Sequence, residues 1–130
     1  MNEVEFILYV RDQNKSRAFY ERLLNIKPFL DVLGMTEFKL AENIKLGLMP
    51  ENGISKIILD KIPHPNTGSG IPRCELYLKV NNPLEYIARA FEFGGMEISK
   101  LQEWDRGDKV GCISDLDGHI IAFAEKRNNN

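Results

Sequence analysis

The chain has 130 residues and a mass of 14.9 kDa, the size of one domain that can bury a core without disulfides. Its net charge of −2 argues against a nucleic-acid-binding surface, and its 43% hydrophobic content argues against a disordered or fibrous chain. We find no apolar run long enough to span a membrane, and the acidic start lacks the basic region of a secretory signal. Since two cysteines, Cys74 and Cys112, are too few for a disulfide framework, we expect a cytoplasmic protein with reduced thiols.

Two strands near the start of each half repeat each other. Residues 5–10 (EFILYV) align with residues 75–80 (ELYLKV), and both segments alternate in the period of two that predicts a strand. One face of each strand is apolar, and the other is mixed. The apolar faces carry Phe6, Leu8, Val10, Leu76, Leu78 and Val80, and the mixed faces carry Glu5, Ile7, Tyr9, Glu75, Tyr77 and Lys79.

A helix pattern follows each of these strands. In the first half, Asp12 or Asn14 can cap a helix whose apolar stripe covers residues 18–24. In the second half, Asn82 is the predicted cap and Pro83 lies at the first helical position, where proline is favoured. The two halves therefore begin in the same way, with a strand and then a helix.

Three short strands are predicted after each helix. They cover residues 29–32, 36–40 and 44–49 in the first half, and residues 97–100, 109–114 and 119–125 in the second. A short helix over 54–61 and a linker rich in proline and glycine over 63–70 connect the halves. We therefore predict one α+β domain over residues 1–130. Its first module covers about 3–50, its linker about 51–72 and its second module about 73–126.

Local sequence runs in these elements resemble one known family. The runs are FILYVRD and SRAFYERLL (6–12 and 16–24), RCELYLKV (73–80), and GDKVG with DLDGH (107–111 and 115–119). They resemble the vicinal oxygen chelate superfamily, which contains glyoxalase, bleomycin-resistance protein and extradiol dioxygenase relatives. The resemblance implies two βαβββ modules that form a curved, mostly antiparallel half-barrel, and a homodimer. It does not select a function, because the family holds both enzymes and drug-binding proteins.

The resemblance also points to four positions where metal-dependent members carry ligands. Carried over to this chain, the first-strand positions are Glu5 and Glu75, and the last-strand positions are Gly47 and Ala122. Glycine and alanine have no donor atom, and a firmly held divalent ion needs three or four protein donors. We therefore expect no metal, and Glu5 and Glu75 would be the ligands if one did bind.

The mixed strand faces supply the candidate ligand-binding residues. They are Glu5, Tyr9, Glu75 and Tyr77, joined by Trp104 from a polar loop. Each has an ordinary alternative. The glutamates can be solvated or paired with a basic neighbour, the tyrosines can be half-buried strand residues, and the tryptophan can cover a sheet edge. The basic residues considered as neighbours are Lys45, Lys79 and Arg73.

His119 is the candidate acid or base, and it follows a turn sequence. The alternative is a hairpin turn that needs Asp117 and Gly118 for its backbone geometry, with His119 opening the next strand. Two functions remain open. The first is binding of a small organic molecule in the cavity of the sheet without an intact metal site. The second is a metal-dependent lyase, isomerase or dioxygenase acting on vicinal oxygens, with Glu5, Glu75 and His119 as its catalytic residues.

Overall fold

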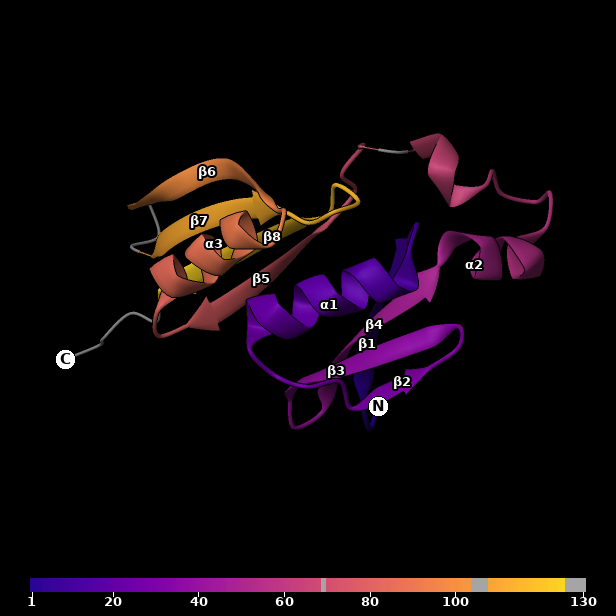
Figure 1. The fold of residues 1–130 in the computed structure, drawn as a ribbon, viewed down its shortest axis with the longest axis horizontal. Coiled ribbons are helices and arrows are strands. Elements are labelled where there is room, and N and C mark those ends of the chain that lie inside the picture. Colours follow the sequence, from indigo (N-terminus) through magenta and orange to yellow (C-terminus); the bar gives the residue numbers. More distant parts are fainter. Residues whose placement is uncertain (69, 104–107, 126–130) are drawn as a thin grey trace. The chain divides into compact units, whose positions relative to one another are not determined.

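The computed structural model describes residues 1–68, 70–103 and 108–125 of the chain. The chain separates into two compact units, residues 1–69 and residues 70–130. Each unit contains a four-stranded mixed sheet and a helix packed on one side of it (Figure 1). No helix in the described part of the chain is long and apolar enough to cross a membrane.

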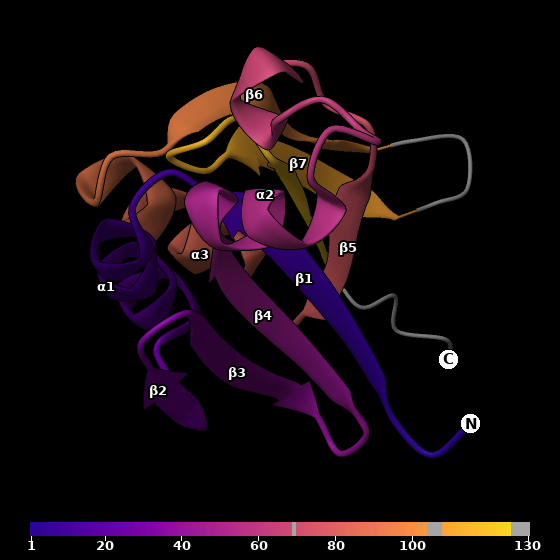
Figure 2. The same cartoon turned by 90° about the vertical axis from the view of Figure 1, so that its right-hand side faces the viewer.

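The first unit follows the predicted order of strand, helix and three strands. Its elements are β1 (Val4–Val10), α1 (Gln13–Leu24), β2 (Leu30–Val32), β3 (Met35–Ala41), β4 (Ile44–Pro50), α2 (Glu51–Ile58) and a 3-10 turn η1 (Pro65–Gly68). The strand order β1-β4-β3-β2 can be followed across Figure 2, with β1 parallel to β4 and the other pairs antiparallel. Tyr20 of α1 lies 6.4 Å from Phe38 of β3, ring centre to ring centre, so the even-numbered face of β3 faces the helix.

Local interactions explain where α1 begins and how it holds the β2–β3 hairpin. Asp12 caps the helix by accepting a 3.0 Å hydrogen bond from the Lys15 backbone. The Gln13 amide donates to the Val32 carbonyl (2.8 Å) and the Thr36 hydroxyl (2.9 Å), and its oxygen accepts from a backbone N–H of the hairpin (3.0 Å). The Gln13 side chain therefore connects the β2–β3 hairpin to the first turn of the helix, and one of its partners, Thr36, is fully buried.

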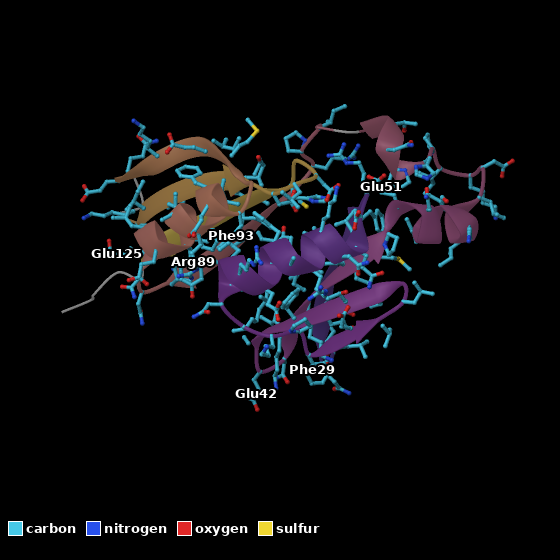
Figure 3. All side chains as sticks on the ribbon, viewed as in Figure 1. Phe29, Glu42, Glu51, Arg89, Phe93 and Glu125 are labelled. Carbon is cyan, nitrogen blue, oxygen red and sulfur yellow. The ribbon has the colours of Figure 1, made fainter. Side chains whose placement is uncertain are left out.

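The second unit repeats the topology of the first. Its elements are β5 (Glu75–Val80), α3 (Pro83–Glu92), β6 (Met96–Glu103), β7 (Lys109–Ser114) and β8 (Ile120–Glu125), with strand order β5-β8-β7-β6. Tyr86 of α3 stacks on Phe123 of β8 at 5.0 Å, and the guanidinium of Arg89, labelled in Figure 3, lies 4.5 Å from the ring centre of Tyr86. Gly94, with φ of 103°, follows the helix in a conformation that favours glycine.

The predicted elements agree with the structure except at some ends. The strand over 109–114 has the predicted bounds, whereas the connecting helix covers Glu51–Ile58 and not 54–61, because it begins directly after β4. The capping role of Asn82 is not seen, since no side-chain hydrogen bond caps α3. Phe6 was expected on the covered apolar face, but half of its surface is exposed, in contrast to buried Leu8 and Val10.

Candidate functional site

The face of the first sheet opposite α1 carries both polar and apolar side chains. The register pairs Glu5 with Lys45, Ile7 with Gly47, and Gly47 with Glu37, which brings these residues onto one face of three adjacent strands. We call this the mixed face of unit 1. It consists of Glu5, Ile7 and Tyr9 on β1, Met35, Glu37 and Lys39 on β3, and Lys45, Gly47 and Met49 on β4.

Two carboxyl groups meet on this face although their strands are not neighbours. Glu5 lies on β1 and Glu37 on β3, and β4 separates these strands by two strand spacings, about 9.6 Å. Nevertheless, the side chain of Glu37 has the largest influence on the pKa of Glu5. Gly47 of β4 lies between them, and a Cβ atom built there would come within 3.1 Å of Glu5 Oε1. The absence of a side chain at position 47 therefore leaves room for the carboxyl of Glu5 above β4.

This contact changes the acidity of Glu5. The hydrogen bond with Glu37, then burial, then the negative charge of Glu37 raise the pKa of Glu5 from 4.5 to about 7, while the charge of Lys45 acts in the opposite direction. Glu5 Oε1 is buried and has no hydrogen-bond partner among the described residues. With a pKa of about 7, Glu5 is partly protonated near neutral pH.

Lys45 is a cation of the mixed face, and two neighbouring side chains hold its ammonium in place. Its ammonium lies 2.9 Å from a carboxylate oxygen of Glu3 and 4.3 Å from the ring centre of Phe29, a residue labelled in Figure 3. The hydrogen bond with Glu3 raises the pKa of Lys45 above its usual value. Lys45 therefore remains a cation at neutral pH and does not supply a neutral amine for nucleophilic chemistry.

The corresponding face of the second unit carries a different set of groups. The Tyr77 hydroxyl donates to Asp108 (3.0 Å), and the ammonium of Lys79 lies 4.0 Å from the same carboxylate. Tyr77 pairs with Ala122 as Ile7 pairs with Gly47, which confirms the internal repeat in atomic detail. Burial, and then the charge of Glu75, raise the pKa of the Cys112 thiol, so at neutral pH this cysteine is a thiol and not a thiolate.

His119 belongs to the β7–β8 turn. Asp115 Oδ1 accepts hydrogen bonds from the backbone N–H groups of Asp117 (2.9 Å) and His119 (2.8 Å), and Asp115 Oδ2 lies 2.8 Å from Nδ1 of His119. The donor atoms of these three residues lie within 4.8 Å of one another, close enough for a metal. However, the carboxylate of Asp115 already makes these hydrogen bonds within the turn, so the structure of the hairpin explains why the three side chains lie close together.

The other candidate residues can be placed unit by unit. Tyr9 is 40% exposed on the mixed face of unit 1, and Tyr77 is 41% exposed in unit 2. Glu5 is brought together with Glu37, whereas Glu75 belongs to the other unit and is exposed. The prediction for Trp104 falls outside the described residues. Sequence reasoning missed Glu37, and its alternation with buried Thr36 and Phe38 was the available signal for its face.

The four ligand positions implied by the resemblance do not provide the donors that a divalent ion needs. Gly47 and Ala122 have no donor atom. The pKa of Glu5 is raised to about 7, so this carboxyl is partly protonated at neutral pH, and the ammonium of Lys45 lies next to it on the same face. Since three or four unprotonated donors are required, these residues do not fit a resident metal.

Comparison with solved structures relates the whole chain to one fold. A glyoxalase-related enzyme from Fulvimarina pelagi is 18% identical, with a TM-score of 0.80 over 97% of this chain and 89% of that one. A glyoxalase/bleomycin resistance protein/dioxygenase family enzyme from Burkholderia phytofirmans is 11% identical, with a TM-score of 0.79 over 93% of this chain and 95% of that one. The chain has the glyoxalase fold. The predicted α+β fold is thus confirmed, and it is the fold of proteins described as glyoxalase/bleomycin resistance/dioxygenase family members.

Other matches to the fold have no stated function. A hypothetical protein from S. aureus is 21% identical, with a TM-score of 0.79 over 97% of this chain and 95% of that one. No family model matches the sequence, and no curated protein matches it. At these identities the likeness establishes the fold alone, so the function has to be argued from the side chains.

Proposed function

We propose that the chain binds a small organic molecule on the mixed face of unit 1. The observation that carries this proposal is the combination of exposed apolar surface with converging polar groups on three adjacent strands. Ile7 and Tyr9 are 41% and 40% exposed, beside the half-buried carboxyls of Glu5 and Glu37. Small-molecule sites combine apolar area with a few fixed polar groups in this way.

The polar groups favour a ligand that is cationic or forms hydrogen bonds. The carboxyls of Glu5 and Glu37 lie on this face, and the charge of Lys45 is largely compensated by Glu3. The aromatic ring of Tyr9 can supply the flat contact area that an organic molecule needs. A metal-dependent lyase, isomerase or dioxygenase is the less favoured function, because two of the four implied ligand positions, Gly47 and Ala122, have no donor atom.

A fragment screen observed by protein NMR tests this proposal. We expect hits to shift the backbone amides of Ile7, Tyr9 and Gly47, and we expect Tyr9→Ala to weaken those hits. Ile57→Ala, on the 67% exposed surface of α2, is the matched control and leaves binding unchanged. Fragments that shift only residues away from the mixed face, or that bind Tyr9→Ala as well as the wild type, would count against the proposal.

The family resemblance supports the further proposal of a homodimer, whereas the charge, hydropathy and cysteine count support a cytoplasmic location with no nucleic-acid or membrane partner. The exposed apolar residues Val4, Phe6 and Ile44 of β1 and β4 provide surface for a second copy. Sedimentation equilibrium tests the dimer, with twice the chain mass as the expected result and a monomer at 100 μM, about ten times a typical assay concentration, as the contrary one.

A further inference from the structure

We propose that the side chain of His64 is a pH-sensitive latch on the segment that leads from α2 to η1. The neutral imidazole fastens this segment to α2, and the protonated imidazole releases it. His64 directly precedes η1, and both α2 and η1 belong to unit 1 (Figure 1). The proposal goes beyond ligand binding on the mixed face and does not depend on it.

The first support is the hydrogen bonding of the imidazole ring, which fits the neutral form of histidine. Nδ1 of His64 lies 3.1 Å from the backbone nitrogen of Asn66, and Nε2 lies 3.1 Å from Oδ1 of Asn52. A backbone N–H can only donate, so Nδ1 accepts this hydrogen bond and the ring proton is on Nε2. The ring therefore joins η1, through Asn66, to the first turn of α2, through Asn52.

The second support is that the backbone of His64 is held independently of its ring. The His64 carbonyl accepts hydrogen bonds from the backbone N–H of Thr67 (3.0 Å) and from the Thr67 hydroxyl (2.7 Å). Pro63 and Pro65 on either side further restrict the backbone of this segment. Because the turn presents the ring in one place, the connection to α2 depends on the two hydrogen bonds of the ring itself.

The third support is backbone strain at the point where the chain leaves α2. Leu59 has φ of 53° and ψ of −130°, a conformation that residues with a side chain rarely adopt. The side chain of Leu59 is 67% exposed, so its burial does not compensate for this strain. The hydrogen bonds of His64 close the segment that begins at Leu59, and we infer that they help to maintain its conformation. When they are lost, the segment can relax.

Protonation of His64 removes a hydrogen bond, and no acid compensates for the new charge. A proton on Nδ1 would face the backbone N–H of Asn66, so that two donors would oppose each other at 3.1 Å. The charged residues of α2 and of the segment after it are Glu51, Lys56, Asp60 and Lys61, and η1 has none. Within the described part of the chain, none of these groups forms an ion pair with His64. Protonation therefore favours the released conformation, and the latch opens as the pH falls through the range of about 8 to 5 in which histidines gain their charge.

NMR of the full-length protein at pH 8 and pH 5 tests the latch without any ligand. Nitrogen-15 shifts of the imidazole report the tautomer, and we expect a proton on Nε2 of His64 at pH 8. Backbone order parameters report the segment, and we expect the value for Asn66 to fall from about 0.85 at pH 8 to less than about 0.6 at pH 5. The amide of Phe93 in the second unit is the internal reference and should not change.

Two variants assign the pH response to one histidine. His64→Asn keeps an acceptor for the Asn66 N–H and cannot gain a proton in this range, so the order parameters of residues 60–67 should be the same at both pH values. His119→Gln is the matched control and should keep the response of the wild type. A proton on Nδ1 of His64 at pH 8, a segment that is equally rigid at pH 5, or a pH response that persists in His64→Asn would overturn the proposal.

Discussion

Replacing Glu5 by glutamine should stabilise the protein above neutral pH and not in acid. The folded protein holds a proton on Glu5 up to about pH 7, whereas the unfolded chain releases it near 4.5. Between these values the folded state binds more protons than the unfolded state, so Glu5 makes stability fall as the pH rises through this window. Glutamine keeps the shape and hydrogen bonding of the protonated acid and cannot lose that proton.

The size of this effect follows from the two pKa values. Each pH unit between them corresponds to about 1.4 kcal/mol, which gives a ceiling of about 3 kcal/mol. Because the side chain is only partly buried, solvent screening reduces this to about 1 kcal/mol, a rise of about 4 °C in melting temperature for a chain of this length.

Urea unfolding of wild type and Glu5→Gln at pH 4.5, 6 and 8 measures this difference. We expect nearly equal free energies of unfolding at pH 4.5 and the full difference at pH 8. Glu75→Gln, an exposed glutamate at the corresponding strand position, should show no such trend. A Glu5→Gln variant that is less stable than the wild type at pH 8 would contradict the raised pKa of Glu5, because an ordinary ion-paired carboxylate stabilises the protein at high pH.

Three further changes probe the geometry of the two units. Gly47→Ala should lower the pKa of Glu5 in a carboxyl NMR titration, because the new Cβ would come within 3.1 Å of Glu5 Oε1 and displace this carboxyl. An unchanged midpoint would mean that the space at Gly47 does not determine the position of Glu5. Gln13→Ala should cost about 1–3 kcal/mol in urea unfolding, because it removes three hydrogen bonds to the β2–β3 hairpin, one of them to buried Thr36, whereas Gln102→Ala, with an exposed hydrogen bond, should cost less than 0.5 kcal/mol or so. Asp115→Ala should cost about 2–3 kcal/mol by calorimetry, because this buried carboxylate accepts two backbone hydrogen bonds in its turn, and a neutral result would mean that the turn does not depend on it.

Much of the fold was predictable because it depends on short-range patterns. The period-two alternation of residues 5–10 and 75–80 predicted two equivalent strands, and both pair in parallel with the last strand of their unit. The helix start at Pro83 was predicted from its fixed backbone angle. The connecting helix was placed three residues too late, because Glu51 to Gly53 carry no apolar periodicity and join the helix through continuity with β4.

The candidate site was only half predictable because it depends on strand order. Periodicity placed Glu5 on the mixed face, and the family resemblance singled out Gly47 as a ligand position without a donor. Sequence gives no strand order, so it did not show that β4 lies between β1 and β3 or that Glu37 can reach Glu5. The glycine predicted as a missing ligand is, in the structure, the residue that makes room for a carboxyl from a third strand.

The most direct test is a crystal structure of the full chain, purified without chelator and soaked with the strongest fragment from the NMR screen. It would show whether the mixed face of unit 1 binds an organic molecule. Diffraction at the zinc and nickel absorption edges distinguishes a metal from an organic molecule. We predict fragment density against Ile7 and Tyr9 and no anomalous peak beside the carboxyls of Glu5 and Glu37. An anomalous peak chelated by Glu5, or a fragment seated on the α1 side of the sheet, would contradict it.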